Sequence, residues 1–407
     1  MTFLSPWAPS QATTLSLEGL NLEGRAALSA FQLAPDRLHL NHGSYGAVPR
    51  VVQEQQDRIR AHVERDPTSF FGEELPAALR GMAQSVAARF GGKGDDWVFC
   101  ENATAAVNGI LASFPIAPGD EMVTTSHAYG AVLKAMREWA KRKGAHVTVV
   151  ELPAIAESDD AIVEAIAAAF GPKSRLLVID HITSATATVL PVKRIVERAR
   201  AAGVAVLVDG AHAPGQVLLD APSFGADWYT GNAHKWLFAP RGCGLLWTAP
   251  ERQAETFPAV LSHGTDAGYR AAFDWIGTRD VSPWLCFAAG AAFHDSIPGL
   301  MDRNRLLAAE GAAILCEGLG AICAAPPQMR GAMASILLKD SPVVSTASGE
   351  FRKALARDYA IIVPVSHFAD RLWLRVSAQI YNGIDDYRRC LSACLELRSG
   401  RFAQHFR

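Results

Sequence analysis

Short apolar segments alternate with amphipathic ones through the middle of the chain, and this alternation limits the fold more than any other feature of the sequence. Strands are expected near 97–100, 121–125, 146–151, 175–181, 204–209, 228–231 and 243–248. Helices are expected near 50–65, 76–90, 129–143, 159–170 and 191–202, with a further one opening at 102. Strands that alternate with helices form a mostly parallel sheet covered on both faces. Gly242 and Gly244 flank a short gap and allow an antiparallel member in the closing pair.

The pattern changes after about residue 285, where long Ala-rich helices begin. We then expect a strand at 334–340, a helix at 348–358, strands at 359–365 and 371–377, and a last helix from 385. This is an α+β module with its own core. The chain is therefore expected to have three parts: an N-terminal arm (1–35) with a short helix that packs on the small domain, a large domain (36–285) and a small C-terminal domain (286–407). Its 407 residues are enough to bury more than one core.

Composition excludes several classes of protein. The chain is 49% hydrophobic and 20% charged, with a formal net charge of −2. It has no basic face for nucleic acid and no apolar run long enough to span a membrane. Its start lacks the features of a secretory signal, and its seven cysteines have no paired spacing, which is typical of the reducing cytoplasm. Dinucleotide, P-loop and zinc-type spacings are also missing, which disfavours a nicotinamide oxidoreductase and a metal site.

A carboxylate closes one of the apolar strands, in the segment VAVLVDGAHAPG. Asp209 there would be costly to bury unless a cation or a hydrogen-bond donor meets it. One interpretation is that Asp209 pairs with the protonated nitrogen of a pyridine ring, which then acts as an electron sink. The other is that it caps the following loop. Asp209 alone leaves both open.

A lysine follows 26 residues later, in GNAHKWLFAPRGCG. Lysine forms imines with aldehydes, and partial burial lowers its pKa toward reactivity. The apolar neighbours Trp236, Leu237 and Phe238 argue against full exposure of Lys235, although a surface lysine in a loop is the plain alternative. In parallel sheets chemistry collects at the carboxyl ends of strands, where Tyr129, Ser184, Asp209 and Lys235 are all expected. Lys235 and Asp209 together indicate an aldehyde cofactor that contains a pyridine ring.

The segment FCENATAAVNGIL places Asn102, Ala103 and Thr104 at the start of a helix. A helix N-terminus offers free N–H groups and a positive dipole end, which suit a phosphate. The Thr104 hydroxyl can add a hydrogen bond. An ordinary Asn or Thr helix cap is the alternative.

Six blocks in order resemble the class V aminotransferase family, and within it the isopenicillin N epimerase-like branch. These blocks are NHGSYGAV, DHITSATATVLPV, DGAHAPG, GNAHKW, WIGTRD and RVSAQIYN, and the resemblance runs from about residue 36 to 390. It implies a pyridoxal 5′-phosphate (PLP) enzyme of fold-type I, with a mostly parallel seven-stranded sheet and a smaller C-terminal domain. It also implies a homodimer with shared active sites.

The resemblance assigns roles around the cofactor ring. Lys235 resembles the Schiff-base lysine and Asp209 the partner of the pyridine nitrogen. His212 stands where relatives place a Gln or His beside the phenolic oxygen. Ser184 stands where cysteine desulfurases have an Asn that faces the same oxygen, and serine is a shorter donor. Tyr129 aligns with the residue that stacks on the ring, with His127 as the alternative.

The resemblance also assigns the phosphate and substrate contacts. The phosphate cup consists of Ala103, Thr104, Asn232 and His234, while Gly277 and Thr278 resemble the segment that reaches the phosphate of the neighbouring subunit. Arg375 resembles the arginine that binds the substrate carboxylate, for which a guanidinium is a two-pronged match. Asn41 to Tyr45 resembles a loop that lines the substrate pocket.

These roles imply that Lys235 removes the α-proton of an amino acid to give a carbanion. Reprotonation at the α-carbon from the opposite face gives an epimerase or racemase, which the resemblance favours; Tyr45, His42 and His367 are the candidates for the second proton donor. A C–S β-lyase and an aminotransferase remain open. Residues 363–368 contain no cysteine where desulfurases carry their nucleophile, which disfavours desulfuration through a persulfide. A PLP-binding protein without turnover is disfavoured because both Lys235 and Arg375 are present.

Overall fold

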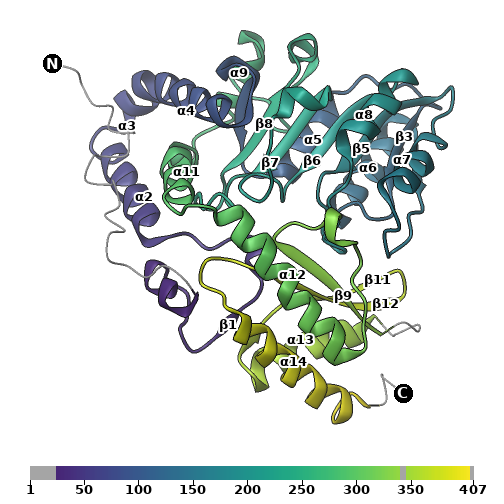
Figure 1. The fold of residues 1–407 in the computed structure, drawn as a ribbon. Helices are drawn as coiled ribbons and strands as arrows, with labels where there is room; N and C mark the ends of the chain where they lie inside the picture. The colour runs from purple at the N-terminus through teal and green to yellow at the C-terminus, as the bar shows by residue number, and fades with distance from the viewer. Residues whose placement is uncertain (1–23, 340–344, 404–407) are drawn as a thin grey trace.

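The computed structural model describes residues 24–339 and 345–403. Its largest sheet has seven strands and forms the core of the upper lobe in Figure 1. The strand order is β2-β8-β7-β6-β5-β3-β4, and β8 is antiparallel to both of its neighbours while the other pairs are parallel. The strands are β2 (Trp97–Cys100), β3 (Glu121–Thr125), β4 (His146–Val150), β5 (Ser174–Asp180), β6 (Ala205–Gly210), β7 (Trp228–Asn232) and β8 (Gly244–Thr248). The predicted mostly parallel sheet, with one antiparallel member in the closing pair, is confirmed.

Helices cover both faces of this sheet, so its central strands are apolar throughout rather than alternating. In β6, Val206 and Val208 pack on one face of the sheet, beneath the helices at 75–90, 192–201 and 287–295. Leu207 packs on the other face, beneath the helices at 103–113 and 130–143. All three are fully buried. Burying a side chain of this size contributes about 1.5–3 kcal/mol. The buried sheet thus fixes the positions of the carboxylates Asp180 and Asp209 near the carboxyl ends of β5 and β6.

The helices predicted in this lobe fall close to their expected ranges. The helices of the lobe are α1 (His42–Tyr45), α2 (Arg50–Val63), α3 (Pro67–Ser69), α4 (Leu75–Phe90), α5 (Ala103–Ser113), α6 (Gly130–Lys143), α7 (Asp159–Ala167), α8 (Val192–Ala201), α9 (Tyr269–Asp274), α10 (Ser282–Leu285) and α11 (Phe287–Asp295). Of these, α1, α3, α9 and α10 are additional short helices. Local capping sets their ends: the Asn102 side chain accepts a hydrogen bond from the Ala105 N–H at the start of α5, and Gly144 ends α6 in a left-handed conformation with φ of 69°.

A second lobe holds an antiparallel sheet in the order β11-β12-β9, with α12 running along β9 and against α14 (Figure 1). Its elements are α12 (Leu300–Leu319), β9 (Met333–Lys339), α13 (Thr346–Asp358), β10 (Ile361–Ile362), β11 (Val365–Phe368), β12 (Arg371–Ser377) and α14 (Ile384–Ser399). The single strand predicted at 359–365 is wrong. Pro364 has no N–H to donate and separates β10 from β11, which belong to different sheets.

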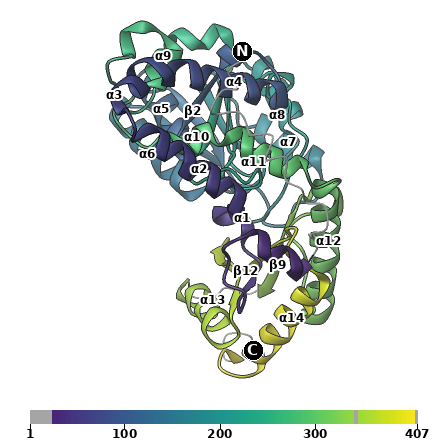
Figure 2. The ribbon, with the colours of Figure 1, turned by 90° about the vertical axis from the view of Figure 1, so that its left-hand side faces the viewer.

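The chain from residue 24 onward ties the two lobes together. Gly24 N–H donates to the carbonyl of Ile380, and β1 (Leu38–His39) pairs with β10. The ring of Phe31 lies edge-on to those of Phe293 and Tyr381. Figure 2 shows α1 at the junction between the lobes. Residues 1–23 of the predicted arm lie outside the described residues, and the three-part division stays a prediction. None of the helices in the described ranges is long and apolar enough to cross a membrane.

Candidate active site

A cavity of about 470 Å³ opens where the carboxyl ends of β5, β6 and β7 meet α1, the start of α5 and strand β12. Its lining comprises Gly43, Ser44, Tyr45, Asn102, Ala103, Thr104, Tyr129, Asp180, Ser184, Asp209, Ala211, His212, Asn232, His234, Lys235 and Arg375. Most of the residues predicted from the sequence are therefore brought together. Asn41, Gly277 and Thr278 are not among the lining residues.

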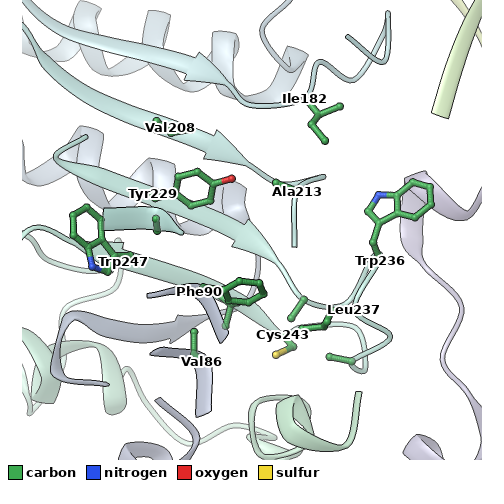
Figure 3. Packing of buried hydrophobic residues seen from close by; sticks show 14 of the residues in the cluster. Val86, Phe90, Ile182, Val208, Ala213, Tyr229, Trp236, Leu237, Cys243 and Trp247 are labelled. Atoms are coloured by element: carbon green, nitrogen blue, oxygen red, sulfur yellow. The ribbon is translucent and has the colours of Figure 1, made fainter. Parts of the chain in front are cut away.

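Lys235 lies on the turn that follows β7. Burial and the nearby charge of Arg375 lower the pKa of the Lys235 amine to about 8, although Asp209 and Asp180 act in the opposite direction. Its Nζ atom is 3.4 Å from Nε2 of His212. The next two residues, Trp236 and Leu237, are fully buried among apolar side chains and fix this turn (Figure 3). A partly neutral amine held in one place is what attack on an aldehyde requires.

Asp209 ends the apolar part of β6 and is 4% exposed. Its Oδ1 accepts a hydrogen bond from the Ala211 N–H at 3.0 Å. Burial raises the pKa of Asp209, while the Ala211 N–H and the charge of Lys235 lower it. A further positive charge, such as a protonated pyridine nitrogen, would favour the ionised carboxylate. The residue is therefore suited to hold such a ring.

His212 lines the cavity and has one unsatisfied polar atom. Its Nδ1 is buried and has no hydrogen-bond partner within the described part of the chain. Burial, with smaller contributions from Lys235 and Arg375, lowers its pKa well below the usual value, so the imidazole is neutral. A buried nitrogen of this kind normally has a partner. A ring oxygen of a bound cofactor would supply one.

At the N-terminus of α5, two hydrogen-bond donors of one residue, Thr104, are free within the part of the chain that the structure describes. Asn232 Oδ1 accepts from the Ala103 N–H at 2.9 Å, and Asn102 Oδ1 accepts from the Ala105 N–H at 2.9 Å. Ala103 therefore lines the cavity without a free N–H. The N–H and hydroxyl of Thr104 make no hydrogen bond with the described residues and remain for a phosphate, which the helix dipole also favours.

Arg375 of β12 is 6% exposed and has no acidic partner among the described residues. Its Nη1 donates to the carbonyl of Ser184 at 2.7 Å and to Oγ of Ser184 at 3.2 Å, and its Nη2 donates to Oγ of Ser44 at 2.9 Å. Nε is buried without a partner. Burial lowers the pKa of Arg375 to about 10. Ser184 thus supports the arginine, and its predicted contact with the cofactor oxygen stays a prediction.

The loop around α1 is fastened to both Arg375 and Lys235. Ser44 Oγ, which accepts from Arg375, donates to Asn41 Oδ1 at 2.5 Å. Asn41 therefore holds the Ser44 side chain through a hydrogen bond and does not itself line the cavity. His42 Nε2 lies 3.0 Å from the carbonyl of Lys235, and a Cβ on Gly46 would sit 2.1 Å from the carbonyl of His234. This close packing places Tyr45, which is 70% exposed, at the mouth of the cavity.

Tyr129, and not His127, lines the cavity. His127 is buried, with Nδ1 2.8 Å from Thr186 Oγ1 and Nε2 3.1 Å from the carbonyl of Pro153. Tyr129 immediately precedes α6 and is 47% exposed. Its ring is thus accessible for stacking on a bound cofactor, whereas the His127 ring is already packed.

Sequence reasoning missed Asp180 as a lining residue, and it missed the hydrogen bond to Arg375 from which Ser44, within the predicted loop 41–45, takes its role. Asp180 ends β5 as Asp209 ends the apolar run of β6, so the same signal, a carboxylate after a buried strand, was present. Ser44 gave no such signal because its role depends on contact with a residue 331 positions away. Gly277 and Thr278 lie on a loop whose Arg279 pairs with Glu101, and their predicted reach to a partner subunit stays a prediction.

The residues present fit PLP. Lys235 offers an amine for the aldehyde, Asp209 a carboxylate for the ring nitrogen, Thr104 two donors for the phosphate, and His212 an unpartnered nitrogen. Within the described residues, no group of three potential ligands is placed to hold a metal ion. The chemistry offered is therefore that of an aldehyde cofactor and a carboxylate-bearing substrate.

Comparisons with known proteins agree with this geometry. A family model described as aminotransferase class-V matches residues 43–284. Isopenicillin N epimerase from Streptomyces clavuligerus is 32% identical over 382 residues, which cover 89% of this chain and 95% of that protein. Putative L-cysteine desulfhydrase 1 from Oryza sativa subsp. japonica is 31% identical over 424 residues, which cover 93% and 88%.

Among solved structures, a mutant of C-DES with glycine covalently linked to its PLP cofactor has the same fold. The TM-score is 0.76 at 20% identity, covering 90% of this chain and 98% of that chain. The fold predicted from the sequence and the resemblance to class V enzymes are confirmed. The chain belongs to the class V aminotransferase family and is a PLP-dependent enzyme.

Proposed function

We propose that this enzyme epimerises or racemises an amino acid at its α-carbon. The observation that carries the proposal is the buried Arg375, which has no acidic partner and shares a cavity with the Lys235 amine. An unpaired buried guanidinium is costly, and a substrate carboxylate would neutralise it. A ligand that places a carboxylate at Arg375 and an amine toward Lys235 has the outline of an α-amino acid.

The protein groups then have distinct tasks. PLP, when bound, supplies an electron sink that makes the α-proton of the amino acid removable. Arg375 holds the carboxylate in a two-pronged contact, which fixes the orientation of the α-carbon. Asp209 keeps a proton on the ring nitrogen by offering it a negative charge. The Lys235 amine, with a pKa near 8, takes the α-proton as general base close to neutral pH.

Inversion at the α-carbon needs a second acid, and Tyr45 is the candidate that the site supports best. The residue lines the cavity, and its hydroxyl makes no hydrogen bond with a described residue. His42 is less suited because both of its ring nitrogens contact protein oxygens, of Tyr381 and Lys235, and burial lowers its pKa to about 4. His367 lies on β11 and is not among the lining residues.

A C–S β-lyase is the second candidate, because a desulfhydrase is about as similar to this chain as the epimerase is. Elimination uses the same base and the same carboxylate contact but needs no acid on the opposite face. An aminotransferase would also share these first contacts. The three reactions differ in where the proton returns and in whether a substituent leaves.

We also propose a homodimer in which Gly277 and Thr278 contribute to the phosphate cup of the partner subunit. Thr278 is exposed, and its loop is held to the start of the α5 region by the Arg279–Glu101 ion pair. A cytoplasmic location is proposed as well, because all seven cysteines are free thiols.

One experiment separates the candidate reactions. The enzyme is incubated with L- and D-amino acids in heavy water, and products are followed by mass spectrometry and chiral chromatography. Epimerisation predicts deuterium at the α-carbon together with loss of chirality. Released keto acid with retention of the amino group on the cofactor would indicate an aminotransferase, and pyruvate with a released thiol would indicate a lyase. Either of those outcomes contradicts the proposal.

The role of Tyr45 has its own test. Tyr45→Phe removes only the hydroxyl, so α-deuterium incorporation should persist while the rate of inversion falls about a hundredfold, as expected for loss of a general acid. Tyr129→Phe is the matched control, since it keeps an aromatic ring in the same cavity. Equal inversion rates in Tyr45→Phe and the unaltered enzyme would exclude Tyr45.

A further inference from the structure

A second carboxyl group lies beside Asp209 in the site. Asp180 is the last residue of β5, and the parallel pairing of β5 with β6 places it opposite Asp209. The two residues are 5% and 4% exposed, and both line the cavity that contains Lys235. Neither forms a salt bridge with any residue that the structure describes. The base of the site thus holds two carboxyl groups, although a pyridine ring has a single nitrogen to pair.

The groups that face Asp180 come from several elements. β6 contributes Asp209, the turn after β7 contributes Lys235, and the residue before α6 contributes the backbone N–H of Tyr129, which faces the Asp180 carboxyl group and favours its ionised form. On the other side of β5, β3 ends in Thr124 and Thr125, which carry no charge. Across the cavity, His212 is neutral and Arg375 is cationic. Asp209 is therefore the nearest like charge and Lys235 the nearest opposite one.

Two buried carboxyl groups this close do not both ionise readily, so the proton stays on the one with less support. Asp209 accepts a hydrogen bond from the Ala211 N–H at 3.0 Å, whereas no described residue donates a hydrogen bond of standard geometry to the Asp180 side chain. In agreement with this, burial and then the charge of Asp209 raise the pKa of Asp180 well above its usual value.

We propose that Asp180 is a positioning residue for the cofactor, which it serves as a neutral carboxylic acid. Its carboxyl group lies beside the backbone N–H of Tyr129, the residue expected to stack on the ring. Because Asp180 stays neutral, Asp209 alone presents a negative charge to the ring nitrogen. This inference concerns cofactor binding and holds whichever reaction follows at the α-carbon.

The test compares isosteric substitutions at the two paired positions in the holoenzyme. Infrared difference spectroscopy at pH 7 detects the carbonyl stretch of a protonated carboxyl group, which is separate from the bands of ionised carboxylates. The spectrum of the unaltered holoenzyme should contain a protonated-carboxyl band that Asp180→Asn lacks. This band reports the protonation state directly, and a merely structural role for Asp180 would not require it.

Cofactor affinity supplies the second readout. Asp180→Asn keeps an acceptor for the Tyr129 N–H and adds no charge change, so its PLP dissociation constant should stay within about threefold of the unaltered value. Asp209→Asn removes the required charge, and its dissociation constant should rise about tenfold to a hundredfold. Asp180→Ala removes the carboxyl group beside the Tyr129 N–H and should weaken binding about tenfold.

Two results would overturn the inference. One is a holoenzyme spectrum without any protonated-carboxyl band that depends on Asp180. The other is an Asp180→Asn variant that loses PLP as readily as Asp209→Asn, since this would mean that Asp180 acts through a negative charge. Because both readouts concern the cofactor, failure of the epimerase proposal would leave them unchanged.

Discussion

Arg375→Met separates substrate binding from protein stability, because the two should change in different ways. Methionine keeps much of the volume of the side chain but removes the guanidinium. Two charge-assisted hydrogen bonds to a carboxylate contribute about 1.5–3 kcal/mol each. Their loss should lower kcat/KM for an amino acid by about 10²- to 10⁴-fold. The effect should lie mainly in KM or in the dissociation constant of the amino acid.

Stability should not fall in parallel. Burial lowers the pKa of Arg375 from its usual value to about 10, which corresponds to a cost of about 3 kcal/mol for holding the charge in the folded protein. This cost is present in full at all pH values below about 10. Methionine removes it but also removes the hydrogen bonds to Ser184 and Ser44, at about 1 kcal/mol each. The two effects nearly cancel.

The assay measures kcat, KM and the thermal unfolding midpoint for Arg375→Met and for Arg371→Met, a control on the same strand whose side chain does not line the cavity. The control should behave as the unaltered enzyme in kcat/KM. An unchanged KM in Arg375→Met would refute the carboxylate role. A loss of 3–5 kcal/mol in stability, as expected when a structural buried ion pair is broken, would show instead that the arginine is a structural residue.

Two further predictions concern Lys235 and the loop that is packed on it. Because the pKa of Lys235 is about 8, the neutral amine becomes tenfold rarer for each pH unit below 8, so the rate of PLP uptake by the apoenzyme should rise with pH up to about 8 and then level off. A rate that is flat from pH 6 to 9, followed by absorbance, would contradict this. Gly46→Ala should displace the loop at 41–46, because its φ is 67° and a Cβ would lie 2.1 Å from the carbonyl of His234. For Gly46→Ala we expect at least a tenfold loss of kcat/KM. Gly119→Ala is the control: its φ is 85° and no atom lies within 4 Å of an added Cβ, so it should cost only about 1–2 kcal/mol of stability. Equal activity in the two variants would count against a role of the loop at 41–46 in catalysis.

Much of this architecture could be predicted because its signals are local. Strand β6 is apolar along its length and ends in a carboxylate, so both its burial and the functional importance of Asp209 can be inferred from one segment. The same holds for the start of α5, where an Asn cap precedes Thr104. These features depend on residues adjacent in sequence, and the structure places them as expected.

The remaining features depend on contacts between distant segments. Ser44 supports Arg375 only because α1 lies against β12, and Asn41 acts through Ser44. His42, a candidate acid from its position in the sequence, is occupied by Tyr381 and the carbonyl of Lys235. The segment predicted as one strand at 359–365 contains parts of two strands, because β10 pairs with β1 and β11 pairs with β12. Register between strands, which also pairs Asp180 with Asp209, is not encoded in any one segment.

The central claim is that Lys235 is the residue to which PLP is bound covalently. Borohydride reduction of the holoenzyme fixes the cofactor to the protein, and digestion followed by mass spectrometry then identifies the modified residue. We predict one phosphopyridoxyl group per chain, on Lys235, and none in a Lys235→Ala variant that has been treated in the same way. Modification of any other lysine, or equal labelling in the variant, would contradict the account.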